Sequence, residues 1–218
     1  MKDRARDTAG EKERIRREIL KRRRGLSQEY CRQADEAIVR SLLESSVYKT
    51  AGTVFVYVSM EGEVDTGELI RFSLEAGKVV AVPRCVDRGI MKACRIGGFG
   101  DLEKGAYGIW EPKESCGETD PGEVDLAVAP CVSCSHDGKR LGYGGGYYDR
   151  YLPSSPAFRV ALCREKLVCS RIPVERTDSL MDLVITEAGR WRAGVPENGI
   201  FTKIERPFLS TAEKQMQK

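Results

Sequence analysis

The chain is organised around one glycine-rich stretch, Arg140-Leu141-Gly142-Tyr143-Gly144-Gly145-Gly146-Tyr147-Tyr148-Asp149-Arg150. Four of the five positions from 142 to 146 are glycine, and glycine lets a backbone approach a ligand closely and adopt a positive φ. Successive N–H groups in such a turn form a concave anion site, and a helix beginning at about Gly146 would add its positive dipole end. The stretch therefore predicts a phosphate-binding loop. A tight glycine turn with its aromatic residues packed in the core remains the alternative.

Charged residues on both sides of the glycines support the phosphate interpretation. Arg140 can meet phosphate oxygens with its forked guanidinium, and Asp149 is a hard oxygen ligand of the kind that holds Mg²⁺ beside phosphates. The chain has no Gly-x-x-x-x-Gly-Lys-[Ser/Thr] sequence, which excludes a P-loop enzyme. Tyr147 stands where a dinucleotide-binding fingerprint needs its third glycine. The hypothesis is therefore a nucleotide-phosphate site of a different kind.

Outward from this loop, buried strands alternate with helical segments. Apolar, β-branched runs predict strands at residues 53–59, 78–83, 124–130, 158–163 and 183–186. Helices are expected at 11–24, from Ser27 to about residue 45, and at 67–76, with a hairpin or irregular segment at 84–100. Beyond Glu187 the apolar residues show no helical or strand periodicity until a possible short helix near residue 210. The pattern predicts an α/β fold, a single Rossmann-like three-layer domain over residues 11–218, with a mostly parallel central sheet flanked by helices. Residues 1–10 are expected to be a flexible N-terminal tail.

Composition narrows the class of protein. The 218 residues are 41% hydrophobic and carry a net charge of +3, which suits a globular protein and does not by itself indicate a nucleic-acid partner. No apolar run approaches the roughly 20 residues of a membrane helix, and the charged N-terminus lacks the apolar core of a secretory signal. Eight cysteines in so long and charged a chain are expected to be free thiols in the reducing cytoplasm. A monomer is expected, because no exposed apolar stripe calls for an interface.

The first predicted helix is strongly basic. Ile15 and Ile19 share one stripe, and Lys12 and Arg16, four residues apart, point the same way. Three interpretations stay open: a solvated basic face, a helix that delivers two cations to a phosphate, or a nucleic-acid-binding arm.

Two loops are candidate walls of a substrate site. The segment from Met60 to Thr66 follows the first strand, and ligands gather at strand ends in open α/β sheets. Glu63 could accept hydrogen bonds from a ligand amine or amide, or it could simply be solvated. In the loop 105–112, Tyr107 and Trp110 could stack on a flat ligand, although such residues more often pack against the domain.

Cys131-x-x-Cys134 and the single histidine, His136, suggest a metal or thiol site, but the support is weak. A structural zinc site needs four ligands, and the other cysteines form no second close pair in the sequence. Free thiols are therefore expected. A redox pair and cysteine–histidine nucleophilic catalysis remain alternatives.

Five blocks in order along the chain resemble the 5-formyltetrahydrofolate cyclo-ligase family, also called methenyltetrahydrofolate synthetase. The resemblance spans residues 11–187. It rests on the basic helix from Lys12, Ser59-Met60-Glu61-Gly62-Glu63-Val64-Asp65-Thr66, Tyr107-Gly108-Ile109-Trp110-Glu111-Pro112, Arg140-Leu141-Gly142-Tyr143-Gly144-Gly145-Gly146-Tyr147-Tyr148-Asp149, and Asp182-Leu183-Val184-Ile185-Thr186-Glu187. The glycine block is the most specific of the five.

The resemblance implies an enzyme in which ATP and 5-formyltetrahydrofolate give 5,10-methenyltetrahydrofolate, ADP and phosphate with the help of Mg²⁺, through a phosphorylated formyl intermediate. It implies catalytic roles for Arg140, Lys12 and Arg16 in neutralising phosphate charge. Implied ATP contacts are Lys12, Glu13, Arg14, Ile15, Arg16, Arg140, Leu141, Gly142, Tyr143, Gly144, Gly145, Gly146, Tyr147 and Tyr148. Implied folate contacts are Val58, Glu63, Tyr107, Tyr143, Gly144, Gly145, Gly146 and Tyr147, and implied Mg²⁺ ligands are Asp149 and Asp182.

Two other classes of function stay open from the sequence. One is an ATP-dependent enzyme with the same fold and a different substrate. The other is a non-enzymatic relative that binds nucleotide or nucleic acid through the basic helix, which would leave Asp149 and Asp182 unexplained.

Overall fold

The computed structural model describes residues 2–105, 108–193 and 203–205, and its centre is a sheet of nine strands. Five neighbouring strands are parallel, in the order β2, β1, β7, β10, β11. Their bounds are β1 Thr53–Val56, β2 Val79–Asp87, β7 Leu126–Ala129, β10 Phe158–Leu162 and β11 Leu183–Thr186. Continuous apolar runs such as Val54–Val56 are fully buried, because a parallel sheet is covered on both faces. The predicted α/β fold with its mostly parallel core is confirmed.

Antiparallel strands extend both edges of this core. Strand β3, Ile90–Ile96, forms the hairpin expected after β2 and pairs with β6, Glu118–Thr119. At the other edge, β12, Gly189–Arg192, pairs with β11 and with β13, Lys203–Glu205. The expectation that no regular element follows Glu187 before residue 210 was wrong, because β12 and β13 lie there. Trp191 is buried between two arginines, an alternation too short to be recognised in the sequence.

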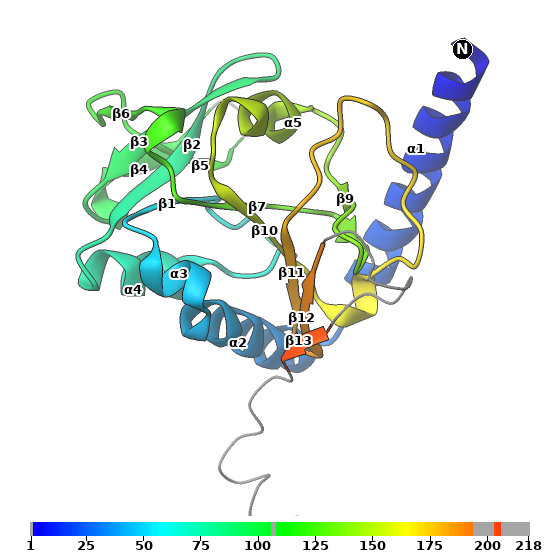
Figure 1. Cartoon of the computed structure of the whole chain (residues 1–218), viewed down its shortest axis with the longest axis horizontal. Coiled ribbons are helices and arrows are strands. Elements are labelled where there is room, and N and C mark those ends of the chain that lie inside the picture. Colours follow the sequence, from blue (N-terminus) through cyan, green and yellow to red (C-terminus); the bar gives the residue numbers. More distant parts are fainter. Residues whose placement is uncertain (1, 106–107, 194–202, 206–218) are drawn as a thin grey trace, which may run out of the picture.

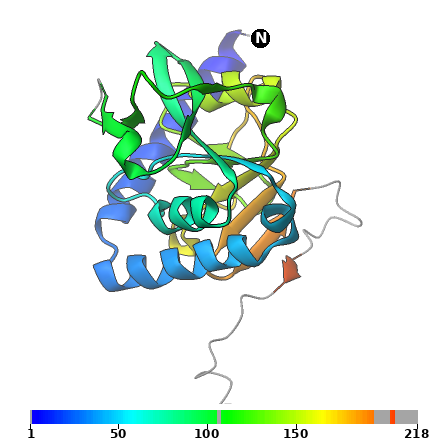
Figure 2. The same cartoon turned by 90° about the vertical axis from the view of Figure 1, so that its left-hand side faces the viewer.

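Helices cover both faces of the sheet (Figures 1 and 2). On one face lie α2, Gln28–Glu44, α3, Ser46–Thr50, and α4, Gly67–Glu75; on the other lies α5, Tyr147–Tyr151. Helix α2 begins as expected at Ser27, whose side chain accepts a hydrogen bond from the Tyr30 N–H. It buries Ala34, Ile38 and Leu42 at helical spacing.

Helix α1 runs from Lys2 to Arg24, so residues 2–10, expected to form a tail, are helical. No proline interrupts this segment, and its single glycine, Gly10, costs a helix only about 1 kcal/mol. Ile15 and Ile19 are buried as predicted. The helix stands beside β9 at one side of the molecule (Figure 1).

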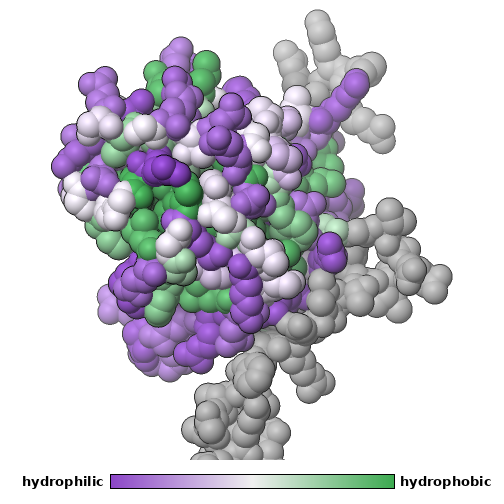
Figure 3. Space-filling model, turned by 60° about the vertical axis from the view of Figure 1, so that its left-hand side comes forward, coloured by the Kyte–Doolittle hydropathy of each residue, from purple (hydrophilic) through white to green (hydrophobic). Residues whose placement is uncertain are grey.

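Short elements complete the described chain. They are β4 Leu102–Lys104 paired with β5 Trp110–Pro112, β8 Ser133–Cys134 paired with β9 Arg140–Leu141, and the 3₁₀ turns η1 Phe99–Asp101, η2 Pro121–Glu123, η3 Leu152–Ser154 and η4 Glu165–Leu167. The helix expected near residue 210 lies outside the described residues. Among the described helices, none has the length and apolar character needed to cross a membrane. The face shown in Figure 3 is largely hydrophilic, with apolar residues gathered towards its middle.

Candidate functional site

A cleft of about 1710 Å³ opens beside the glycine loop. Its walls come from α1, the loop after β1, the β2–β3 turn, the glycine loop with α5, and the segment 175–180. Sites for a single small ligand usually measure about 300–1,000 Å³, so this cleft has room for two. In Figure 1 the segment before β11 passes between α1 and α5, and its residues 175–180 line the cleft.

The glycine loop has the backbone that its sequence predicts. Gly144 and Gly146 have φ values of 99° and 69°, which residues with a Cβ rarely adopt. Gly146 precedes α5 as expected, but this helix is a single short turn of five residues. Its dipole is correspondingly small, so the anion-binding character of the loop depends more on backbone N–H groups and neighbouring cations than on α5.

Arg140 is buried at the base of the loop, with 4% of its side chain exposed. Its Nη2 donates to Asp149 Oδ1 at 2.8 Å and its Nη1 donates to the Pro130 carbonyl at 3.1 Å. Asp149 Oδ1 also accepts from the Ser179 N–H at 3.1 Å. Within the described chain nothing donates to Asp149 Oδ2, and Asp149 lines the cleft. One carboxylate oxygen is therefore available to a cation in the cleft.

Helix α1 directs two cations into the cleft. Arg16 Nε donates to the Gly142 carbonyl at 2.9 Å. Lys12 Nζ lies 2.5 Å from Asp178 Oδ2 and 3.1 Å from Glu175 Oε2. Only 12% of the Lys12 side chain and 15% of the Arg16 side chain are exposed, so neither belongs to a solvated basic face, and both line the cleft.

The other implied ATP contacts on α1 differ from one another. Glu13 lines the cleft and forms an ion pair with Arg16. Arg14 is outside the lining, exposed and paired with Glu18, and Ile15 is buried in the core. The structure therefore brings Lys12, Glu13 and Arg16 to the site through their side chains, but not Arg14 or Ile15.

Glu63 lies in the opposite wall and is 6% exposed. Its Oε2 accepts from the Met60 N–H at 2.8 Å, while its Oε1 is buried with no hydrogen-bond partner. Burial raises the pKa of this carboxyl above its usual value, against the lowering effects of the Met60 N–H, the nearby Tyr143 hydroxyl and Arg23. A buried acceptor without a partner beside a large cleft is suited to binding a ligand N–H.

Two arginines that the sequence analysis did not single out hold these walls. Arg164 forms a two-pronged ion pair with Asp35, at 2.7 Å for each bond, and donates to the carbonyls of Gly62 and Glu63 at 2.8 and 2.6 Å. Arg23 donates to the Tyr143 hydroxyl at 2.8 Å. Each of these contacts joins two residues that lie more than 100 positions apart in the sequence, so no local motif could have revealed them.

The remaining predicted residues fall into three groups. Tyr107 lies outside the described residues. Asp182 is not in the cleft lining, and its Oδ2 accepts from the Arg159 N–H at 2.8 Å. It precedes β11, at the amino end of a parallel strand, whereas Val58 follows the carboxyl end of β1. The third group adds to the lining residues already described, and its members are Val58, Leu141, Gly142, Tyr143, Gly144, Gly145, Gly146, Tyr147 and Tyr148.

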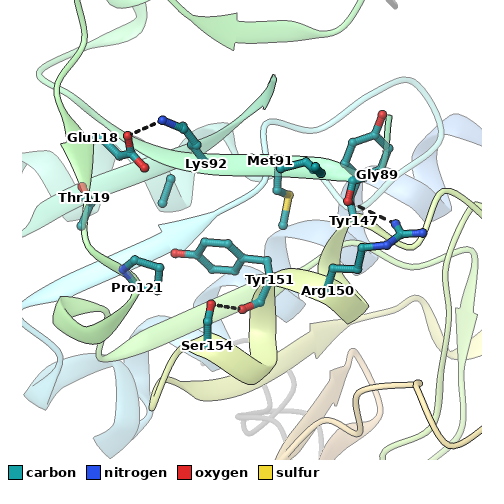
Figure 4. A pocket seen from close by; sticks show the side chains of 12 residues that line it. Gly89, Met91, Lys92, Glu118, Thr119, Pro121, Tyr147, Arg150, Tyr151 and Ser154 are labelled. Carbon is teal, nitrogen blue, oxygen red and sulfur yellow. Dashed lines mark hydrogen bonds and ion pairs between the residues drawn. The ribbon is translucent and has the colours of Figure 1, made fainter. Parts of the chain in front are cut away.

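A smaller pocket of about 180 Å³ adjoins the cleft (Figure 4). The two share Gly89, Met91, Tyr147 and Arg150 as lining residues. Arg150 Nη1 donates to the carbonyls of Gly89 and Gly145, at 3.1 and 2.9 Å. Arg150 therefore fastens the β2–β3 turn to the glycine loop and fixes the shape of both cavities.

His136 does not join a catalytic pair with the neighbouring cysteines. Its ring stacks on Trp191 with centroids 4.0 Å apart, and its Nε2 lies 3.2 Å from Glu165 Oε1. It is absent from the cleft lining. This placement gives no support to cysteine–histidine nucleophilic catalysis.

The buried Glu63 carboxyl leads to a stability prediction. The pKa of this carboxyl is raised in the folded protein, so the unfolded chain ionises at a lower pH than the folded one. The free energy of unfolding therefore falls as pH rises above the ordinary pKa of 4.5. We expect Glu63→Gln to raise the free energy of unfolding at neutral pH by about 1–3 kcal/mol, and to have little effect below the ordinary pKa. Urea unfolding of the wild type and of Glu63→Gln, at neutral pH and at a pH below the ordinary pKa, checks this. The same difference in unfolding free energy at both pH values would contradict the prediction.

Comparison with known proteins gives consistent matches. A sequence model of the 5-formyltetrahydrofolate cyclo-ligase family matches residues 8–187. A probable 5-formyltetrahydrofolate cyclo-ligase of Caenorhabditis elegans is 32% identical over 178 residues, covering 74% of this chain and 85% of that protein. The 5-formyltetrahydrofolate cyclo-ligase of Escherichia coli K12 is 28% identical over 179 residues, covering 79% of this chain and 98% of that protein. The solved structure of Aquifex aeolicus 5,10-methenyltetrahydrofolate synthetase superposes with a TM-score of 0.76 at 30% identity, covering 85% of this chain and 94% of that one.

Proposed function

Since this chain belongs to the 5-formyltetrahydrofolate cyclo-ligase family, we propose that it cyclises 5-formyltetrahydrofolate to 5,10-methenyltetrahydrofolate and converts ATP to ADP and phosphate. The observation that carries the proposal is the cleft itself. It has the size for two ligands, with cations and a glycine loop in one wall and the buried acceptor of Glu63 in the other.

The reaction needs the formyl oxygen converted into a leaving group. Transfer of the γ-phosphoryl group to that oxygen releases ADP and gives an iminium phosphate. The neighbouring folate nitrogen then attacks the formyl carbon and loses its proton, the ring closes, and the C–O bond breaks to release phosphate. Phosphoryl transfer asks a protein mainly for positioning and charge stabilisation. Arg140, Lys12 and Arg16 supply positive charge, and the backbone N–H groups of Gly144 to Gly146 supply donors beside them.

Mg²⁺ fits the residues of this wall. Asp149 lines the cleft, and no described residue donates to its Oδ2, so this oxygen suits a hard divalent cation. When bound, the ion would screen the negative charge of the phosphates. Asp182, the other ligand implied by the resemblance, would need to exchange its contact with the Arg159 N–H to reach the cleft.

Glu63 would orient the folate by accepting a hydrogen bond from it. Arg164 and Asp35 act through Glu63: they fix the backbone carbonyls of Gly62 and Glu63, and so the direction of the carboxyl. These two are positioning residues, because neither is in the cleft lining.

Lys12 gives a prediction specific to ATP. We expect Lys12→Ala to raise KM for ATP about tenfold or more, since a charge-assisted hydrogen bond contributes roughly 1.5–3 kcal/mol. The matched control is Lys21→Ala, an exposed lysine on the same helix. Initial rates at saturating folate measure both values. An unchanged KM for ATP in Lys12→Ala would remove Lys12 from the phosphate site.

The proposed function is tested with purified protein, 5-formyltetrahydrofolate, ATP and Mg²⁺, by following the absorbance of the methenyl product. We expect a signal that requires all three components. ATP binding without any product would contradict the proposed substrate, and it would direct attention to the wall around Glu63.

The state of the cysteines bears on where the protein works. All eight are free thiols in the structure, which supports a reducing compartment such as the cytoplasm. We also propose a monomer in solution, which sedimentation analysis can check.

A further inference from the structure

Three cysteine thiols converge beneath the wall of the cleft. Cys131 follows β7, Cys163 follows β10, and Cys134 ends β8. Strands β7 and β10 are parallel neighbours with Ala129 opposite Ala161, so residues two positions further along both strands lie side by side. The Sγ atoms of Cys131, Cys134 and Cys163 all lie within 4.8 Å of one another. The sequence analysis saw only the first pair, because Cys163 is 29 positions beyond Cys134 and is brought in by strand register.

The cluster has the chemistry and spacing of a metal site. The three residues are 7%, 0% and 3% exposed, and all three are free thiols. Metal–thiolate bonds of about 2.3 Å place three sulfur atoms around a central ion roughly 4 Å apart. The observed separations are within reach of that value after small side-chain rotations.

The number of protein ligands at the cluster indicates which metal ion it could bind. Within the described residues the cluster offers three ligand atoms, whereas structural zinc usually takes four and iron–sulfur clusters are held by four cysteines. The three thiols are largely shielded from solvent, which disfavours water as a fourth ligand. Soft thiolates in a three-coordinate, dry site favour Cu(I) among the common metal ions.

The surroundings supply positive charge for the thiolates. Arg23 Nη2 donates to the carbonyls of Cys131 and Val132, at 3.1 and 3.3 Å. The Cys131 thiol donates to the Leu162 carbonyl at 3.3 Å, and the Cys163 thiol donates to the Arg164 carbonyl at 3.5 Å. Each thiol that becomes a ligand releases its proton to solvent as the ion binds, so these contacts to carbonyls are exchanged for bonds to the ion.

We propose that Cys131, Cys134 and Cys163 form a binding site for one Cu(I) ion in three-coordinate thiolate geometry. The site is separate from the cleft, since none of the three cysteines lines it.

The test is an anaerobic titration of the full-length reduced protein with Cu(I), in competition with a coloured Cu(I) chelator. Thiolate-to-copper charge-transfer absorption reports the ligands. We expect one tightly held ion per chain, and binding at least about 100-fold weaker in Cys134→Ala. Cys163→Ala should behave in the same way, which keeps the test valid if one variant folds poorly. The matched control is Cys94→Ala, a buried cysteine outside the cluster, which should bind as the wild type does.

Three results would overturn the proposal. One is the absence of a charge-transfer band in wild-type protein. Another is equal Cu(I) binding in Cys134→Ala and Cys94→Ala, which would assign the ion to other thiols. The third is tight binding of Zn²⁺ with no retention of Cu(I), which would require a fourth ligand and a different site.

Discussion

Replacing Arg140 by lysine is expected to lower kcat by about 100- to 1,000-fold, the usual cost of removing one preorganised donor to a developing charge. Lysine keeps one positive charge but cannot reproduce the fork that reaches both Asp149 and the Pro130 carbonyl. Because Arg140 is buried, Arg140→Ala would also leave Asp149 without its cation, at a cost of about 3–5 kcal/mol in stability.

The measurement is the rate of methenyl product formation at saturating ATP and folate. Circular dichroism and thermal unfolding establish that Arg140→Lys is folded. Arg95→Lys, at an exposed position of β3, provides the same substitution away from the cleft and should turn over as the wild type does. Wild-type turnover in Arg140→Lys would mean that the fork of Arg140 only supports the loop.

Asp149→Asn is expected to reduce kcat about 100-fold or more and to raise the Mg²⁺ concentration needed for half-maximal activity. Asparagine keeps an oxygen that can accept from Arg140 and from the Ser179 N–H, so the loop should stay in place. It removes the negative charge that a divalent cation needs, and loss of several kcal/mol of charge stabilisation corresponds to at least this change in rate.

Asp182→Asn is the informative comparison for this variant. Asparagine can still accept from the Arg159 N–H, so a purely structural Asp182 predicts an unchanged Mg²⁺ requirement. An equal increase in the Mg²⁺ requirement in both variants would show that Asp182 reaches the metal when the ligands are bound. A change in neither variant would exclude both residues as metal ligands.

Much of this protein is determined by local sequence patterns. Apolar β-branched runs predict the five parallel strands, because a strand covered on both faces must be apolar throughout. The four glycines between 142 and 146 predict the loop, since the φ values of Gly144 and Gly146 require residues without a Cβ. The spacing of Lys12 and Arg16 predicts that they share one face of α1, and both line the cleft.

Only the tertiary structure decided which distant residues meet. The pairing of Arg164 with Asp35, the contact of Arg23 with Tyr143 and the arrival of Cys163 beside Cys131 all depend on strand order and register. It also decided that Asp149 faces the cleft while Asp182, at the amino end of β11, holds the backbone of Arg159. Such contacts join residues tens to more than a hundred positions apart, and local propensity carries no information about them, because packing of the whole sheet sets their distances.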